Sequence, residues 1–207
     1  MLITQLIIVL CIAASLYALN DQSVFYIWAF SPFEIKARNQ WYRAFTHAFI
    51  HADFTHLGFN MIVLYPFGGA LEQKMKFHYE DKASLYFVLL YLGGILFATL
   101  LSYKRHQDNS SYYSVGASGA VSAVIFATII LMPSMSLRPL FVPFAIPGFI
   151  YGALYIIAEI LMDRFSKYNI AHDAHLMGSL YGISFICLID LERFKEFLIY
   201  VQNYFGG

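Results

Sequence analysis

The sequence predicts an all-α membrane protein in which six helices span the bilayer. Of its 207 residues, 59% are hydrophobic and only 13% are charged, and the mean hydropathy is +0.60. Soluble domains contain about 45–50% apolar and about 25% charged residues. Six apolar runs approach the roughly 20 residues that an α-helix needs to cross the hydrocarbon core. One compact bundle is the simplest organisation for this length, so residues 1–207 are treated as a single domain.

The six apolar runs contain few charged or imidazole side chains. Only His56, Glu159, His175 and Asp190 fall inside them, and the other charges gather in the connections. The first run has no basic segment before it and no small-residue cleavage site at its end, so we expect an uncleaved span rather than a signal peptide. The predicted spans are 2–19, 54–71, 83–103, 115–132, 140–162 and 174–190.

Two further segments are amphipathic rather than apolar. Residues 20–53 are too long for a hairpin connection and too mixed for a span, and they contain Trp28 and Trp41 among several Phe and Tyr residues. Aromatic rings of this kind collect at headgroup depth, so we expect an interfacial segment. In the tail, apolar residues recur at helical spacing over 191–205, which indicates an interfacial helix or an extension of the sixth span.

Composition disfavours several classes of function. The formal net charge is zero, so nothing points to nucleic acid as a partner. Cys11 and Cys187 both lie in apolar runs, where cysteine packs as a small hydrophobic residue, and we expect no disulfide. A transporter or channel would favour an internal repeat or charges at mid-membrane, and we find neither. Lys and Arg divide almost equally between the two sides of a six-span protein, so charge does not set the orientation.

The most informative residue is Ser118, which stands near the start of the fourth apolar run. Gly116 and Gly119 flank it, and small residues let helices approach closely inside membranes. A hydroxyl in this position is a candidate nucleophile if a general base lies beside it. The alternative is a packing motif whose serine bonds its own helix backbone.

The candidate base is His175, in the sixth run. It lies one turn before Gly178, and Gly182 follows one turn later, so all three share a helix face. Contact between the small-residue faces of the fourth and sixth spans would bring His175 to Ser118. A histidine within a span is by default a functional hypothesis because its burial is costly, and the alternative is a structural histidine.

No acid is evident that would orient His175. Asp173 is two residues away, on another face of the helix, and His172 lies on a similar face nearer the membrane edge. Glu159 lies near the end of the fifth span, where we expect it to pair with a loop cation or to reach the interface, and we assign it no role. The residues therefore predict a Ser–His pair without an acid.

His56 and Asn60 form a second polar pair, spaced i, i+4 on the second span. Their side-chain donors, with the backbone N–H of Ser118, could stabilise an oxyanion, and the alternative is hydrogen bonding between helices. A metal ranks low, because His47, His51, His56 and His175 match no recognisable zinc spacing. We expect neither a metal nor another cofactor.

These residues belong to an ordered set of motifs that covers nearly the whole chain. The motifs are Trp41-Tyr42-Arg43, Phe45-Thr46-His47, residues 51–61 with His56 and Asn60, residues 68–72, Gly116-Ala117-Ser118-Gly119-Ala120, and residues 174–178 followed by Gly182. Through the order of these motifs rather than any one of them, the chain resembles the rhomboid family of intramembrane serine proteases.

The resemblance implies a fold, an activity and a location. The fold would be a six-helix rhomboid-like bundle with a half-embedded first loop, in which Arg43 is a structural anchor. Ser118 would be the nucleophile and His175 the base, with His56, Asn60 and the Ser118 amide at the oxyanion. The substrates would be single-span membrane proteins within the lipid bilayer. The chain would lie in a bacterial inner membrane with cytoplasmic termini.

The sequence departs from the family's pattern at two positions. Ser122 stands where some relatives place an aromatic residue against the histidine, and Met177 makes the face before Gly178 bulkier. The main alternative to a protease is a catalytically silent relative that binds membrane proteins. Such relatives usually lack the serine or the histidine, and Ser118 and His175 are both present here, which favours an enzyme.

Overall fold

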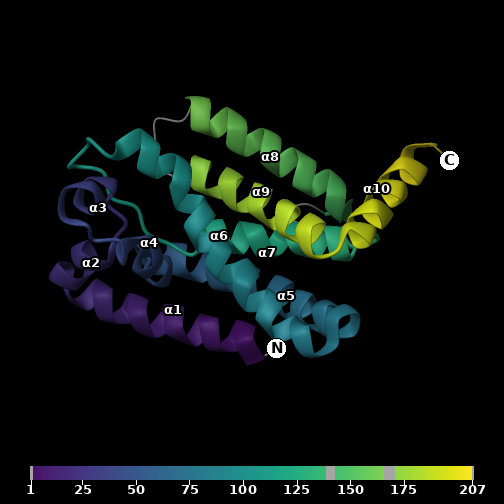
Figure 1. Ribbon diagram of the computed structural model, residues 1–207, viewed down its shortest axis with the longest axis horizontal. Coiled ribbons are helices and arrows are strands. Elements are labelled where there is room, and N and C mark those ends of the chain that lie inside the picture. Colours follow the sequence, from purple (N-terminus) through teal and green to yellow (C-terminus); the bar gives the residue numbers. More distant parts are fainter. Residues whose placement is uncertain (1, 139–142, 166–170, 207) are drawn as a thin grey trace.

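The computed structural model describes residues 2–138, 143–165 and 171–206 and consists almost entirely of helices (Figure 1). The predicted all-α class is confirmed within these residues. The elements are α1 (Leu2–Asn20), α2 (Gln22–Trp28), α3 (Pro32–Arg38), α4 (Arg43–Thr46), η1 (His47–Phe49), α5 (Phe54–Tyr79), η2 (Glu80–Lys82), α6 (Ala83–His106), α7 (Ser118–Leu131), β1 (Ser136–Leu137), β2 (Ile146–Pro147), α8 (Gly148–Phe165), α9 (His172–Ile189) and α10 (Leu191–Gly206).

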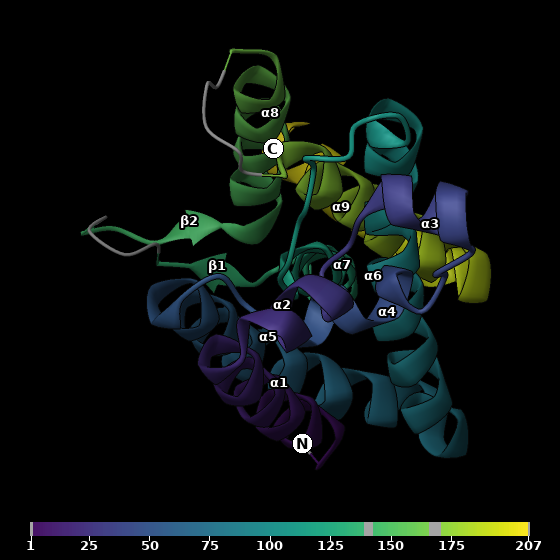
Figure 2. The ribbon, with the colours of Figure 1, turned by 90° about the vertical axis from the view of Figure 1, so that its left-hand side faces the viewer.

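Helix α7 is the centre of the bundle, and α5, α6 and α9 pack around it (Figure 2). Every residue from 119 to 131 is buried. A helix that is apolar on all sides is buried either in a protein core or in a membrane, and the sequence of α7 has no charged residue. Small residues permit the close packing, because a Cβ on Gly182 of α9 would overlap the backbone of Ala123.

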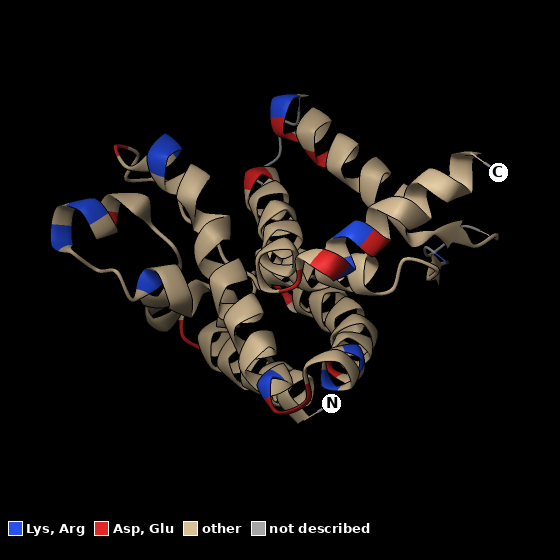
Figure 3. Cartoon of the chain, turned by 45° about the vertical axis from the view of Figure 1, so that its right-hand side comes forward, with Lys and Arg blue, Asp and Glu red and all other residues tan. Residues whose placement is uncertain are grey.

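The long apolar helices and the distribution of charge suit a membrane. By length and hydropathy, α1 and the run Phe54–His106 are candidate membrane spans. Helices α9 and α10 are long and apolar enough to span a membrane only when they are taken together, and a bend of 117° lies between them. Helix α7 is apolar but has only 14 residues. Charged residues lie mostly at helix ends and in connections (Figure 3). The number of spans, six, remains a prediction.

The fifth helix begins later than the sequence predicts. Part of its predicted start, residues 140–142, lies outside the described residues, and α8 begins at Gly148. Just before it, Ile146 and Pro147 form a short antiparallel pair with Leu137 and Ser136 of β1. Proline has no N–H and disfavours the α conformation in the residue before it, so Pro147 ends the extended segment and the helix starts after it.

Residues 20–53 form a compact cap of short helices at one end of α1 (Figure 1). Asp21 caps α2 by accepting from the N–H groups of Ser23 and Val24. Ser31 caps α3, and Pro32 occupies its first position. These side chains satisfy the amides that a helix start leaves unpaired. The cap carries Arg43 and also His47 and His51, which contact the segment just before α7.

The tail forms a separate helix and does not extend the sixth span straight onward. Helix α10 turns by 117° from α9, and Asp190 at the break accepts from the backbone N–H of Arg193. One face of α10 packs its aromatic rings against Phe149 of α8, while Leu198 and Ile199 are exposed. Its location at a membrane interface stays a prediction.

Candidate active site

A cavity of about 720 Å³ lies between α5, α7, α8 and α9 and contains the predicted site. Ser118 and His175 line it together with His56 and Asn60. The remaining wall is largely apolar, with Phe59, Val63, Val121, Ile125, Tyr151 and Tyr155 among its residues. An apolar cavity with a few converging polar groups is the usual form of a ligand site.

The segment before α7 fixes the position of Ser118, the first residue of that helix. Gly116 has φ +120°, a conformation that favours glycine, and a Cβ there would come within 2.8 Å of His56 Nε2. The N–H of Gly116 donates to the carbonyl of His47, and the N–H of Ala117 donates to His51 Nε2 at 3.4 Å. Two side-by-side contacts with the cap therefore anchor the chain next to the serine.

Ser118 Oγ lies 2.7 Å from His175 Nε2. His175 belongs to the first turn of α9, whose N-terminal end faces the start of α7. Gly119 of α7 and Gly178 of α9, the small residues predicted to pack there, do meet at the contact between the two helices, where their backbones touch. The structure thus joins two residues that are 57 positions apart in the sequence.

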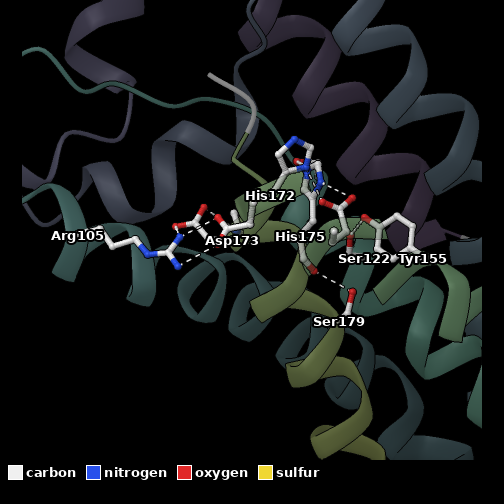
Figure 4. Close-up of polar contacts among 11 residues, drawn as sticks. Arg105, Ser122, Tyr155, His172, Asp173, His175 and Ser179 are labelled. Atoms are coloured by element: carbon white, nitrogen blue, oxygen red, sulfur yellow. Dashed lines mark hydrogen bonds and ion pairs between the residues drawn. The ribbon is translucent and has the colours of Figure 1, made fainter. Parts of the chain in front are cut away.

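The structure corrects the expectation that no acid contacts His175. Glu159 Oε1 lies 3.0 Å from His175 Nδ1, and Glu159 Oε2 lies 2.7 Å from His172 Nδ1. Figure 4 shows His172 and His175 projecting side by side from α9. Glu159 is buried, so the expected contact with a loop cation or with the interface is wrong.

A sequence signal for Glu159 was present. Tyr151, Tyr155 and Glu159 follow one another at intervals of four and so share one face of α8. Tyr155 forms a hydrogen bond of 3.0 Å with Ser122 of α7, so this polar face of α8 meets the bundle. Ser122, which stands where some relatives place an aromatic residue, thus makes a polar contact with α8.

His56 and Asn60 both reach the cavity from α5. The Asn60 amide donates to the carbonyl of His56 at 3.0 Å, while the N–H of His56 donates to the capping residue Asp53 at 2.7 Å. The rings of His56 and His51 meet edge to face, 5.1 Å apart. The two side chains share the cavity with Ser118, and both are polar groups that a bound carbonyl could approach.

Arg43 is an internal anchor of the cap, at 6% exposure. Its Nη1 donates to the carbonyls of Tyr26 and Ala29, at 2.5 and 2.9 Å, and its Nε donates to Gln40 at 2.6 Å. These bonds connect α2, the turn after it and the start of α4. The arginine lies away from the cavity and contributes to the site only by holding the cap together.

A second polar cluster holds the start of α9. Asp173 accepts from the Ser102 hydroxyl at 2.7 Å and lies 3.6 Å from Arg105, which also pairs with Asp163 of α8 (Figure 4). Asp173 therefore points away from His175, as its place on another helix face predicts. This cluster ties α6, α8 and α9 together beside Ser118 and His175.

Among the described residues, one group of side chains could hold a metal ion. It consists of Glu159, His172 and His175, whose ligand atoms lie within 4.8 Å of one another. Both carboxylate oxygens already accept from an imidazole, and these two hydrogen bonds account for the convergence of the three side chains. His47 and His51 bond instead to Arg43 and Ser15, so the four histidines weighed from the sequence do not gather at one point.

The chain is similar to rhomboid proteins. Residues 38–190 match the family model described as "Rhomboid domain". "RHOMBOID-like protein 12, mitochondrial" of Arabidopsis thaliana is 30% identical over 166 residues, which cover 72% of this chain and 47% of that protein. "Rhomboid-like protein 15" of the same species is 28% identical over 193 residues, 88% of this chain and 45% of that protein.

A bacterial relative is covered more completely. "Putative rhomboid protease YdcA" of Bacillus subtilis (strain 168) is 30% identical over 161 residues, 76% of this chain and 72% of that protein. The chain spans about half the length of the Arabidopsis relatives named above. The family model and the apolar helices agree, and the chain belongs to the rhomboid family as an integral membrane protein.

Proposed function

We propose that this chain is an intramembrane serine endopeptidase that cleaves single-span membrane proteins, with Ser118 as nucleophile and His175 as general base. The observation that carries the proposal is the 2.7 Å contact between Ser118 Oγ and His175 Nε2 inside a cavity of about 720 Å³. A nucleophile within hydrogen-bond reach of a base is the arrangement that acyl transfer requires.

The reaction begins with proton transfer. Neutral His175 accepts the hydroxyl proton through Nε2 while Ser118 Oγ attacks the carbonyl carbon of the scissile bond. The carbonyl oxygen becomes an oxyanion, for which His56, Asn60 and the N–H of Ser118 are the candidate donors. The amide of Ser118 is at the first position of α7, where backbone N–H groups have no intrahelical acceptor.

The second half returns the enzyme to its starting state. The C–N bond breaks as the His175 imidazolium donates its proton to the departing amine, leaving an ester on Ser118. Water then attacks the ester carbonyl, His175 accepts the water proton, and the acid product leaves as the proton returns to Ser118 Oγ. The polar group of His, Asn and Ser side chains on the cavity wall provides a place for that water.

The substrate must enter the cavity in an extended form. A helix hides its scissile bond within its own hydrogen bonds, so local unwinding precedes attack. We therefore expect small residues at the cut and Gly or Pro nearby, since both lower helix stability. Equal cleavage of a span idealised to Leu and Ala would contradict this preference. The proposed location is a bacterial inner membrane, with the termini in the cytoplasm.

The test is cleavage of a tagged single-span substrate in liposomes. Wild type should cleave it, while Ser118→Ala and His175→Ala should not. Ser122→Ala is the matched control, because Ser122 lies one turn further on α7 and lines the same cavity. Cleavage by Ser118→Ala at the wild-type rate would contradict the assignment of the nucleophile.

A further inference from the structure

We propose that Glu159 is a positioning residue for His175, so that the site works as a Ser118–His175–Glu159 triad with His172 as a second support for the carboxylate. This inference rests on the proposed function, because it assigns a role within the same reaction. It concerns an acid on α8 for which the sequence suggested no part in the chemistry.

The contacts form a continuous chain of hydrogen bonds. Ser118 Oγ bonds His175 Nε2 at 2.7 Å, His175 Nδ1 bonds Glu159 Oε1 at 3.0 Å, and Glu159 Oε2 bonds His172 Nδ1 at 2.7 Å. The side chains of Glu159 and His172 are each 6% exposed, and that of His175 is 17% exposed. Of these four residues, Ser118 and His175 line the cavity, whereas Glu159 and His172 do not. The series of hydrogen bonds therefore meets the cavity at the end where the reaction would take place.

The hydrogen-bond chemistry fixes the tautomer of His175. An ionised carboxylate can only accept, so Nδ1 of His175 must carry the proton that it shares with Glu159. In a neutral imidazole the other nitrogen then has a lone pair, and that nitrogen is Nε2, which faces Ser118 Oγ. Glu159 thereby holds His175 in the form that can accept the serine proton.

The carboxylate also suits the charge that the reaction creates. When His175 takes the proton of Ser118 it becomes a cation, and Glu159 Oε1 is already 3.0 Å from its Nδ1. A charge fixed in a water-poor site stabilises such a cation more strongly than water does. His172 occupies the second oxygen, so the buried carboxylate keeps two partners throughout.

The positioning depends on contact between two helices. His172 and His175 lie one turn apart on α9, whereas Glu159 belongs to α8. One turn further along α8, Asp163 makes two hydrogen bonds to Arg105 of α6, at 2.8 and 3.0 Å. Both carboxylates tie α8 to the bundle, but only Glu159 touches the proposed base. Asp163 is therefore the matched control for a merely structural role.

The experiment measures kcat and KM for a single-span substrate in liposomes, comparing wild type with Glu159→Gln, Glu159→Asp and Asp163→Asn. Glu159→Gln has almost the same shape but no charge and one acceptor oxygen. We expect kcat to fall roughly 10²- to 10⁴-fold with KM little changed, the behaviour of a triad whose acid is neutralised. Glu159→Asp, which keeps the charge, should retain more activity than Glu159→Gln, and Asp163→Asn should stay close to wild type.

The opposite pattern would overturn the inference. Equal kcat in Glu159→Gln and wild type, or an equal loss in Asp163→Asn, would reduce Glu159 to a structural tie between helices. Melting in detergent reports whether each variant folds. If Glu159→Gln does not fold, Glu159→Asp decides: a lowered kcat at unchanged KM supports the inference, and an unchanged kcat contradicts it.

Reaction of Ser118 with a fluorophosphonate separates this inference from the proposed function. Wild type that neither cleaves nor reacts would overturn the proposed function and the triad with it. Wild type and Glu159→Gln that react at the same rate would overturn the triad alone. Slow reaction of Glu159→Gln beside fast reaction of wild type and Asp163→Asn is the expected result.

Discussion

Gly178 of α9 lies so close to Gly119 of α7 that a Cβ atom on Gly178 would overlap the Gly119 carbonyl oxygen. The two helix backbones are therefore in direct contact at this point. Ser118 immediately precedes Gly119, and His175 lies one turn before Gly178. The close approach of two glycines thus sets the distance at which the serine and the histidine meet, which is 2.7 Å between Oγ and Nε2.

Gly178→Ala should therefore separate α7 from α9. The obstructing atoms are backbone, which cannot rotate away as a side chain can, so we expect a loss of about 1–3 kcal/mol of stability, as for overpacked cores. Cleavage activity should fall as Ser118 and His175 move apart. Melting in detergent and cleavage in liposomes measure the two effects.

Gly58→Ala of α5 is the control, because a Cβ at Gly58 has no atom within 4 Å. Alanine is the better helix former by up to about 1 kcal/mol, so this variant should melt at or above the wild-type temperature. A Gly178→Ala protein that melts and cleaves like wild type would show that the small-residue contact does not position the site.

Asn60→Ala tests the oxyanion assignment. Loss of one donor in such a site costs at most about 10²- to 10³-fold in kcat. The amide of Asn60 also donates to the carbonyl of His56 within α5, so melting should be measured beside the kinetics. We expect lower kcat at nearly constant melting temperature. An unchanged kcat would assign Asn60 to packing of the helix instead.

Arg43→Lys should loosen the cap of short helices. An ammonium group cannot reproduce the fork with which Arg43 reaches the carbonyls of Tyr26 and Ala29 together with Gln40. Leaving buried acceptors unpaired costs about 1–3 kcal/mol, which melting in detergent should detect.

Arg38→Lys is the comparison for this substitution. The Arg38 side chain is 67% exposed and pairs with Glu34 on the surface of α3, where an ion pair contributes about 0–1 kcal/mol. Its melting temperature should stay within error of wild type. Equal losses in the two variants would remove any special role for Arg43.

Acid should destabilise the protein through His51, which lies in the connection between α1 and α5. Burial, and to a smaller extent the nearby His56, lower the pKa of His51 to about 3 against the opposing effect of Asp53. The neutral ring suits its surroundings: Nε2 accepts from the N–H of Ala117, so Nδ1 carries the hydrogen that faces Ser15 Oγ. A second ring proton would point at another N–H.

The sign of this effect follows from the lowered pKa. Below pH 6.5, the ordinary pKa of histidine, His51 takes up a proton in the unfolded chain. In the folded protein it stays neutral until about pH 3. Stability should therefore fall between these values by about 1.4 kcal/mol for each pH unit. His51→Gln should make the decline of the melting temperature with acid shallower. An identical decline in both proteins would contradict the assignment to His51.

The sequence was most informative where polar residues interrupt apolar runs. Ser118 and His175 stand out because hydrocarbon penalises unpaired polar groups, and the small residues around them mark the faces that meet. The all-α class follows from composition for the same reason. Helix α5 continues beyond the predicted span of residues 54–71 to Tyr79, because Lys and Glu continue a helix well although hydropathy drops at Glu72.

The acid partner of His175 was missed for a geometric reason. Glu159 precedes His172 by 13 residues and His175 by 16, across a connection between two helices. Periodicity shows which residues share a face of α8. It does not show which residues of α9 pack against that face. The start of α8 was missed because apolar residues before Gly148 continue the hydropathy signal through a segment that Pro147 keeps extended.

Whether Ser118 is the nucleophile is tested most directly by treating the protein with a fluorophosphonate and identifying the labelled residue by mass spectrometry. We expect that Ser118 is labelled, that Ser122 is not, and that His175→Ala loses the label because no base remains to accept the serine proton. Labelling at another serine, or labelling of Ser118 that persists at the wild-type rate in His175→Ala, would contradict this assignment.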